Sequence, residues 1–431
     1  MEKRKLKELI VEHTGSVLKR HNLLPRYIPN LSTIIHKKEI VVITGVRRCG
    51  KSSLMRIILH DLIRQKALPV ANILYLNFED ERFVEFTYED FDALYESYLE
   101  LNNPEGKRYL FFDEIQNIIY WEKWINRIYE FEEVKIFITG SNATLLSGEI
   151  ATAITGRNIP ISLFPFSFKE LLTMNGIPID PKSLYDREKR VQVKRNFDTF
   201  IEVGGFPEAA ITGDNTILQY YFKDILYKDI IARYSIRNIK EMKELFLYLA
   251  TNIGNLCSYR NLARVISVNS TNTVKNFLEY LENTYLFFRV GLFDYSLKKQ
   301  MYNPSKIYCV DTALARSMAF KFSHDTGRIY ENIVFVELMR NGKEIYYWKS
   351  CNNFEVDFIL RKGTKIREII QVCADISKKE TQTRQIRGVL EAASEFNLKK
   401  ALIITGDFSG EIMEEGVDIT FMPLWQWLIL G

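Results

Sequence analysis

The chain has 431 residues, more than a single hydrophobic core normally serves, so two to four domains are expected. Hydrophobic residues make up 47% of the chain and charged residues 26%, a composition that excludes a mostly disordered protein. The 58 basic and 54 acidic residues give a net charge of +4, which is too small to indicate an obligate nucleic-acid binder.

Three features of the sequence bear on where the protein resides. The first 13 residues form a charged helical pattern and lack the apolar core of a signal peptide. The most apolar stretch, residues 421–431, is shorter than the roughly 20 residues that span a bilayer, so we expect a core element. The five cysteines include no CxxC pair and indicate neither a zinc site nor a disulfide framework. A cytoplasmic protein without a membrane span is therefore expected.

The first part of the chain has the pattern of an α/β fold. From residue 39 to about residue 165, short apolar runs alternate with amphipathic helical stretches, which predicts βαβ units and a mostly parallel sheet. In such sheets ligands bind at the carboxyl ends of the strands. The predicted strands are residues 40–44, 73–77, 109–112 and 135–139.

A phosphate-binding motif follows the first predicted strand. Residues 45–52 read GVRRCGKS, match G-x-x-x-x-G-K-[ST] and precede a helical run, so they have the strand, loop and helix context that a simple glycine-rich turn lacks. Lys51 would reach the β- and γ-phosphates of ATP, and Ser52 would ligate Mg²⁺. The predicted nucleotide-binding residues are Gly45, Val46, Arg47, Arg48, Cys49, Gly50, Lys51, Ser52 and Ser53.

An acidic pair ends the third predicted strand, 62 residues after Lys51. The apolar run at 109–112 leads directly into Asp113 and Glu114, which places two carboxylates at the edge of the sheet where ligands bind. We expect Asp113 to hold Mg²⁺, directly or through water, and Glu114 to orient and polarise the attacking water. An acidic pair after a strand is also a common helix N-cap, which is the alternative role.

Two further positions are candidates for catalysis. Ser141 and Asn142 follow the fourth predicted strand, where a γ-phosphate sensor would lie if this strand runs between the strands that carry the loop and the acids. The alternative is a polar turn that caps the next helix. Arg157 is a candidate to stabilise transition-state charge, within its own subunit or in a neighbouring one; otherwise it is a surface arginine.

Taken together, these motifs resemble one known family. It is the bacterial and archaeal P-loop ATPases of the AAA superfamily that carry a C-terminal domain of unknown function. The resemblance covers nearly the whole chain, and it implies an additional-strand, catalytic-glutamate P-loop fold and ATP hydrolysis with the lysine, serine and acidic pair in the roles given above. The cellular role of most members is unknown. The matching segments are GVRRCGKS (45–52), LFFDEIQ (110–116), ITGSNATLL (138–146), GR (156–157) and GGFPE (204–208).

The rest of the chain divides into three predicted domains after the ATPase core at 1–165. Residues 166–239 read as a helical lid, and residues 240–325 have the helix, turn, helix spacing of a winged-helix module. Residues 326–431 read as a second α/β domain.

Within the winged-helix module, residues 273–285 are the candidate recognition helix. Asn272 and Lys275 lie at its amino-terminal end, where base contacts are usually made. Glu279 and Glu282 on the same element would repel phosphates. DNA contact and a packing or lid role both remain open.

The C-terminal domain resembles a restriction-endonuclease-like fold with an altered site. The order is a helix with Glu337, then a strand with Asp357, then a strand that ends in Gln371 and Cys373. In similar proteins this last strand carries an E-x-K motif, two acids of the site hold a metal, and the lysine assists the attacking water. Gln371 and Cys373 occupy the places of the second motif's acid and lysine, so one metal ligand and the cation are missing. We expect no nuclease activity and a fold kept for contact with nucleic acid or protein.

Three classes of function are compatible with this reading. The leading hypothesis is an ATP-driven switch whose conformation a nucleic-acid or protein partner reads, with a homo-oligomer as one arrangement. The second is a scaffold that binds nucleotide without hydrolysing it, and the third is a DNA-processing effector. The sequence does not distinguish the partner, the oligomer or the purpose of hydrolysis.

Overall fold

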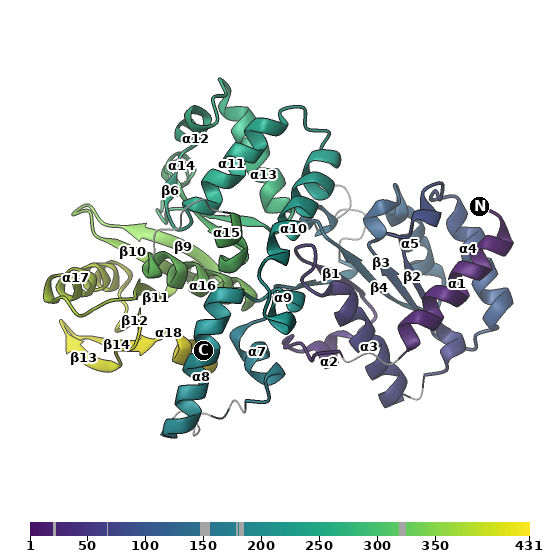
Figure 1. Cartoon of the computed structure of the whole chain (residues 1–431), viewed down its shortest axis with the longest axis horizontal. Helices are drawn as coiled ribbons and strands as arrows, with labels where there is room; N and C mark the ends of the chain where they lie inside the picture. Colours follow the sequence, from purple (N-terminus) through teal and green to yellow (C-terminus); the bar gives the residue numbers. More distant parts are fainter. Residues whose placement is uncertain (20–22, 67, 147–155, 178–179, 181–184, 319–324) are drawn as a thin grey trace. The chain divides into compact units, whose positions relative to one another are not determined.

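The computed structural model describes residues 1–19, 23–66, 68–146, 156–177, 180, 185–318 and 325–431 (Figure 1). The chain divides into two compact units. The first contains residues 1–164 and the short stretch 283–285, and the second contains residues 165–282 and 286–431. The second unit therefore includes three of the four predicted domains, and the finer division stays a prediction.

The first unit is built on a five-stranded, wholly parallel sheet of order β2-β3-β4-β1-β5. Its three inner strands are almost completely buried, as expected for a sheet covered on both faces. The prediction of a parallel α/β sheet is confirmed. Only β5 was not predicted, because Pro160 interrupts its apolar pattern; as an edge strand it tolerates proline. The strands are β1 (Ile40–Thr44), β2 (Ile73–Asn77), β3 (Arg108–Asp113), β4 (Val134–Gly140) and β5 (Asn158–Ser162).

Helices cover this sheet, and three of them share one apolar core with the strands. In α5, buried residues Trp121, Trp124, Ile125 and Ile128 follow the i, i+3, i+4, i+7 spacing of a core-facing helix. α1 and α4 bury residues in the same core, where the rings of Phe91 and Trp124 stack 4.8 Å apart. The helices are α1 (Lys3–Leu18), α2 (Leu31–Ile34), α3 (Lys51–Lys66), α4 (Asp90–Asn102) and α5 (Trp121–Phe131), with short 3-10 turns at η1 (Val70–Asn72), η2 (Glu81–Phe83), η3 (Ile115–Asn117) and η4 (Ala143–Leu146).

The second unit begins with the helices of the predicted lid. A capping box starts α7, because Ser167 and Glu170 satisfy each other's backbone N–H groups. The predicted turn at Gly204 is held by Asp311, which accepts a hydrogen bond from the N–H of Gly205 at 2.7 Å. A Cβ on Gly204 would lie 2.5 Å from that carboxylate, so glycine is required. The elements are α7 (Phe168–Met174), α8 (Arg187–Val203), α9 (Pro207–Thr212), α10 (Ile217–Asp224) and the π-helix η6 (Ile225–Ala232).

The next segment contains helices and a small antiparallel sheet of order β6-β8-β7. α12 and α13 are joined by a short turn, so the element order is that of the predicted winged-helix module, which stays a prediction. The elements are α11 (Ile239–Thr251), β6 (Leu256–Cys257), α12 (Tyr259–Val265), α13 (Thr271–Asn283), β7 (Phe287–Val290), α14 (Leu297–Tyr302), β8 (Ser305–Cys309) and α15 (Thr312–Met318).

The last segment is a second α/β arrangement, as predicted, around a six-stranded mixed sheet of order β13-β14-β12-β11-β10-β9. α16 and α18 bury residues in one core with the sheet, and α17 buries residues in another. The apolar stretch 421–431 is not one element, because Pro423 ends β14 and precedes α18. In the described parts of the chain, no helix combines the length and apolar character needed to cross a membrane. The elements are α16 (Thr326–Arg340), β9 (Glu344–Lys349), β10 (Glu355–Lys362), β11 (Lys365–Cys373), α17 (Lys379–Phe396), β12 (Lys400–Thr405), β13 (Gly410–Glu414), β14 (Val417–Pro423) and α18 (Leu424–Leu430).

Candidate nucleotide-binding site

The glycine-rich loop joins β1 to α3 and has the backbone that its glycines predict. Gly45 and Gly50 have φ values of 151° and 102°, which residues other than glycine rarely adopt. A Cβ on Gly45 would lie 2.1 Å from the carbonyl oxygen of Leu163. Since α3 begins at Lys51, the loop leads into a helix amino terminus, which favours a bound phosphate.

Lys51 is buried, with 4% of its surface exposed, and its ammonium points across the loop. It donates hydrogen bonds to the carbonyl oxygens of Gly45 at 3.2 Å and Val46 at 3.3 Å. It also lies 3.4 Å from Oε1 of Glu114. A buried ammonium needs acceptors, so phosphate oxygens that enter the loop would replace weaker carbonyl partners with charged ones.

Asp113 ends β3 at the same edge of the sheet and is fully buried. The hydroxyl of Thr139 donates to one of its oxygens, and the hydroxyl of Tyr75 donates to the other at 3.0 Å. Burial and the charge of Glu114 raise the pKa of Asp113, against hydrogen bonds from three hydroxyls, including that of Ser52, that lower it. Ser52 and Asp113, the two predicted metal ligands, therefore lie together.

Glu114 adopts a left-handed backbone conformation with a φ of 51° and is 9% exposed. Its backbone N–H donates to Oγ1 of Thr139 at 2.9 Å, and Nε2 of Gln116 donates to its carboxylate. Burial raises the pKa of Glu114, but the charge of Lys51 and the hydrogen bond from Gln116 outweigh burial and lower it. The carboxylate is thus held in place and charged, as a general base must be.

The chemistry of these side chains fits ATP with Mg²⁺. A hydroxyl and a carboxylate oxygen are the hard ligands that Mg²⁺ prefers, and it commonly binds one or two such protein groups together with nucleotide phosphates. When bound, Mg²⁺ would neutralise charge on the β- and γ-phosphates. Lys51 would bind those phosphates, and Ser52 with Asp113 would hold the metal.

Ser141 and Asn142 lie at the carboxyl end of β4, and each is 1% exposed. β4 lies between β3, which carries the acids, and β1, which carries the loop. This is the strand order on which the sensor hypothesis depended. Both side chains therefore lie at the edge of the sheet where the γ-phosphate is expected, and their roles stay predictions.

Arg157 lies at the opposite edge of the sheet. The register pairs Ile40 with Asn158, and the carbonyl of Arg157 accepts a hydrogen bond from the N–H of Ile40 at 2.7 Å, at the start of β1. The loop follows the far end of that strand, about 16 Å away for five residues. Arg157 contacts Glu130 at 3.5 Å and the ring of Tyr129. The distance is too large for Arg157 to stabilise charge in the site of its own subunit, so that prediction is wrong. Its role in the site of a neighbouring subunit stays a prediction.

The remaining residues of the loop differ in their exposure to solvent and in their contacts. Arg47 forms an ion pair with Glu79 at 2.6 Å, and Arg48 and Ser53 are exposed. Cys49 is buried, and burial raises the pKa of its thiol. Its carbonyl accepts a hydrogen bond from Arg26 at 2.9 Å.

Several contacts of the site were not predicted. Thr139 lies within β4 and Tyr75 within β2, and the apolar pattern of these strands indicated only sheet structure. Arg26 also donates to the carbonyl of Phe164 at 2.6 Å and so joins the loop to the end of β5. Gln116 lies two residues after Glu114, and this short spacing could have indicated a partner for the carboxylate.

Comparison with known proteins agrees with this geometry. A family model described as an AAA domain matches residues 37–172, which include the loop and the acidic pair. The chain belongs to the AAA superfamily of P-loop ATPases. Two domains of unknown function, DUF8612 and DUF4143, match residues 194–325 and 326–427 of this AAA protein.

Relatives of this AAA protein extend over nearly its whole length. The uncharacterized protein MJ1544 of Methanocaldococcus jannaschii is 33% identical over 406 residues, covering 90% of this chain and 88% of the relative. An uncharacterized protein of Haemophilus influenzae is 31% identical over 423 residues, covering 95% and 98%.

Two solved structures resemble part of the chain at low sequence identity. Aeropyrum pernix Orc1 in complex with DNA has a TM-score of 0.31 at 11% identity and covers 73% of this chain and 90% of Orc1. AMPPCP-bound DnaA from Aquifex aeolicus has a TM-score of 0.28 at 12% identity and covers 59% and 84%.

The predicted remnant of a nuclease site in the C-terminal domain is rearranged. Glu337 does not join Asp357; it pairs with Arg340 at 3.1 Å, so the prediction for Glu337 is wrong. Glu331, six residues earlier on α16, lies near Asp357 instead. Six helical residues rotate a side chain by about 240° around the helix axis, so Glu331 and Glu337 lie on different faces of α16. The ammonium of Lys306 lies 2.9 Å from Glu331 and 2.8 Å from Asp357.

Lys306 forms the centre of this cluster and is 3% exposed. A third carboxylate, Glu355, lies 2.7 Å from it. Gln371 donates to Asp357 at 2.8 Å, and the thiol of Cys373 donates to the carbonyl of Asp375. The cation of the cluster is thus a lysine from β8, which the sequence did not predict. Gln371 is a neutral hydrogen-bond donor to Asp357.

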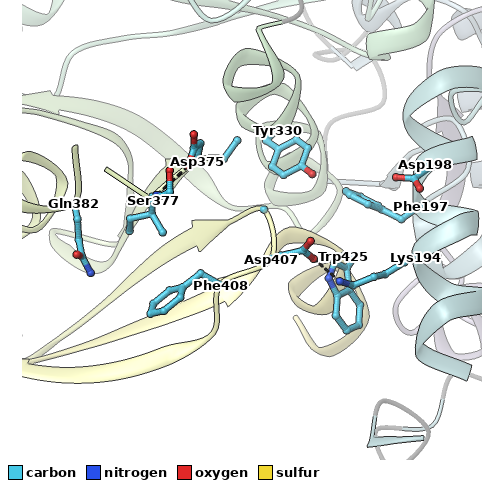
Figure 2. A pocket seen from close by; sticks show the side chains of 13 residues that line it. Lys194, Phe197, Asp198, Tyr330, Asp375, Ser377, Gln382, Asp407, Phe408 and Trp425 are labelled. Carbon is cyan, nitrogen blue, oxygen red and sulfur yellow. Dashed lines mark hydrogen bonds and ion pairs between the residues drawn. The ribbon is translucent and has the colours of Figure 1, made fainter. Parts of the chain in front are cut away.

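A cavity of about 660 Å³ lies in the second unit, between α8 and the carboxyl ends of the parallel strands β11 and β12 (Figure 2). The ammonium of Lys194 bonds to Asp407 at 2.5 Å and lies over the ring of Trp425. Asp198 and Asp375 add negative charge to the lining. Because the lining mixes both signs of charge with aromatic rings, it does not select one class of ligand. The rings are those of Phe197, Tyr330, Phe408 and Trp425.

Proposed function

We propose that this AAA protein binds ATP with Mg²⁺, hydrolyses it, and uses the cycle to drive a conformational change that a nucleic-acid or protein partner reads. The observation that supports hydrolysis is the position of Glu114. Its charged carboxylate is fixed beside Lys51 at the mouth of the loop, 3.4 Å from the ammonium.

Each group has a distinct role in the proposed reaction. Lys51 binds the β- and γ-phosphates and stabilises the charge that develops on them. Ser52 and Asp113 supply the oxygen ligands for the metal. Glu114 orients and polarises the water that attacks the γ-phosphate, with Gln116 holding the carboxylate in position. Ser141 and Asn142 would contact the γ-phosphate from β4.

The competing function is a scaffold that binds nucleotide without hydrolysis. A scaffold needs the loop and the metal ligands but no charged, held carboxylate beside the γ-phosphate position. The hydrogen bonds that fix both Glu114 and Asp113 through Thr139 therefore favour a hydrolase.

Phosphate release from ATP and Mg²⁺ tests the proposal. We expect steady turnover by the wild type, loss of nucleotide binding in Lys51→Ala, and loss of turnover in Glu114→Gln. Glu85→Gln, an exposed acid of the same unit, is the matched control and should keep wild-type turnover. Tight ATP binding without turnover in the wild type, with or without duplex DNA, would favour the scaffold instead.

DNA is the proposed partner of α13. Lys275 and Asn272 are exposed near its amino terminus. Glu282, which was expected to repel phosphates, is paired with Arg289, whose Nε lies 2.8 Å from its carboxylate. Its charge is therefore compensated, which removes part of the objection to DNA contact, although Glu279 stays exposed.

Salt-dependent binding of duplex DNA measures this contact. Removing one phosphate contact should weaken binding about equally for all sequences and reduce the salt slope by about one. We expect Lys275→Ala to have that effect, and Lys343→Ala, a change of an exposed lysine outside α13, to have none. Binding that is unaffected by Lys275→Ala, or no binding at all, would favour a protein partner.

A nuclease function is not proposed. The site has a neutral Gln371 where similar proteins have an acid, and Lys306 occupies the space between the carboxylates. Hydrolysis of DNA that survives purification and is lost in Asp357→Ala would contradict this view.

A further inference from the structure

Residues 283–285 belong to the first unit, although the chain on both sides of them belongs to the second. They connect α13 to β7. Here the hydroxyl of Tyr285 donates to Oγ1 of Thr44 at 2.7 Å. Thr44 is the last residue of β1 and immediately precedes Gly45, so this short stretch is anchored at the base of the phosphate-binding loop.

The anchor holds two strand ends at once. Tyr285 also makes a side-chain hydrogen bond to Ser162, the last residue of β5 and the register neighbour of Thr44. Thr44 is fully buried. Burial raises the pKa of Tyr285, so the phenol is neutral and available as a donor at pH 7. A buried hydroxyl stabilises the structure only while its hydrogen-bond partners stay in place.

The backbone of Tyr285 has a conformation that is uncommon for tyrosine. Its φ is 58°, in the left-handed region that follows many helices and that usually contains glycine. The N–H of Leu286 donates a hydrogen bond to the carbonyl of Leu281 at 3.2 Å, as is common at the end of a helix. A glycine at position 285 would allow this bond with less backbone strain. A tyrosine in this conformation is disfavoured unless its side-chain contacts compensate.

Nucleotide binding would disturb the atoms next to this anchor. Lys51 donates to the carbonyls of Gly45 and Val46, and the phosphates of ATP would compete with these carbonyls for the ammonium. Gly45 lies so close to Leu163 that no side chain would fit between them. A change at Gly45 therefore reaches the neighbours of Thr44 and Ser162 directly, because closely packed atoms cannot absorb it.

We propose that Tyr285 is a positioning residue that transmits the nucleotide state of the loop along the chain to α13 and β7. This inference rests on the proposed function, since it requires that the loop binds ATP. It identifies the contact by which the ATP cycle would reach the predicted winged-helix module.

Hydrogen–deuterium exchange of residues 271–290 tests this role, with and without Mg²⁺ and a non-hydrolysable ATP analogue. We expect the analogue to change amide exchange in α13 and β7 of the wild type. Tyr285→Phe, which loses only the hydroxyl, should reduce that change about fivefold, the lower end of ordinary coupling between sites. Its affinity for the analogue should stay within about threefold of wild type.

Two further variants make the result specific. Tyr285→Gly suits the left-handed backbone, so α13 should still end normally while the response to nucleotide is lost; removal of the half-buried ring should lower the thermal unfolding midpoint. Tyr295→Phe, which alters a tyrosine that is 77% exposed, should respond as the wild type does.

The outcomes separate this inference from the function on which it rests. A wild-type response in Tyr285→Phe and Tyr285→Gly would overturn the role of Tyr285 while leaving ATP binding intact. Analogue binding without any exchange change in wild-type α13 would overturn it as well. If the wild type binds no nucleotide, the proposed function fails and this inference fails with it.

Discussion

At the scale of single residues, one hydroxyl orders the acidic pair. Thr139 donates to Asp113 and accepts from the N–H of Glu114, so the proposed metal ligand and the proposed general base contact the same side chain. Asp113 is fully buried. If the hydroxyl of Thr139 were removed, Asp113 would lose a hydrogen bond that opposes the rise in its pKa.

Thr139→Val keeps the shape of this side chain and removes the hydroxyl. Leaving a buried carboxylate and an N–H group short of a partner typically costs about 1–3 kcal/mol. We expect kcat for ATP to fall about tenfold or more and the unfolding midpoint of the first unit to fall, with Thr139→Ser close to wild type in both. Unchanged kcat in Thr139→Val would show that the acids are positioned without it.

At the scale of secondary-structure elements, the sequence predicts what is local. Strands β1 and β2 were predicted with their observed ends, because apolar runs and polar ends are neighbours in the chain. Long-range pairing was not predictable. Lys306 comes from β8 and meets Glu331 of α16 and Asp357 of β10, and no spacing links these positions. Glu337 was chosen on the right helix but on the wrong face.

Lys306→Met tests this cluster. It would leave three carboxylates without their central cation, and breaking a buried ion pair in this way costs about 3–5 kcal/mol. We expect a large loss of stability in the second unit, measured by denaturant unfolding. The matched control is Lys343→Met, whose exposed pair with Glu368 is worth about 1 kcal/mol or less. Equal effects of the two variants would mean that the cluster is not a stabilising centre.

At the scale of the whole molecule, the open question is whether Arg157 serves a neighbouring subunit. It cannot reach the loop of its own chain, and its side chain is 39% exposed. An arginine supplied from a neighbour would act only in an assembly that places it beside the γ-phosphate.

Mixing two inactive variants tests this arrangement. If Arg157 acts between subunits, Arg157→Ala should bind ATP normally and lose most turnover, as arginines in this role account for about 10³-fold or more of the rate. Adding Glu114→Gln protein should then restore part of the activity, because each variant supplies what the other lacks. Wild-type turnover in Arg157→Ala alone would rule out the role.

The central claim is that Glu114 activates water for ATP hydrolysis at a loop that binds ATP without it. The most direct measurement compares ATP affinity and phosphate release in wild type and Glu114→Gln under the same conditions. We predict similar or tighter ATP binding in Glu114→Gln with phosphate release reduced about 100-fold or more, in line with the loss of a general base. Phosphate release by Glu114→Gln at the wild-type rate would contradict the account.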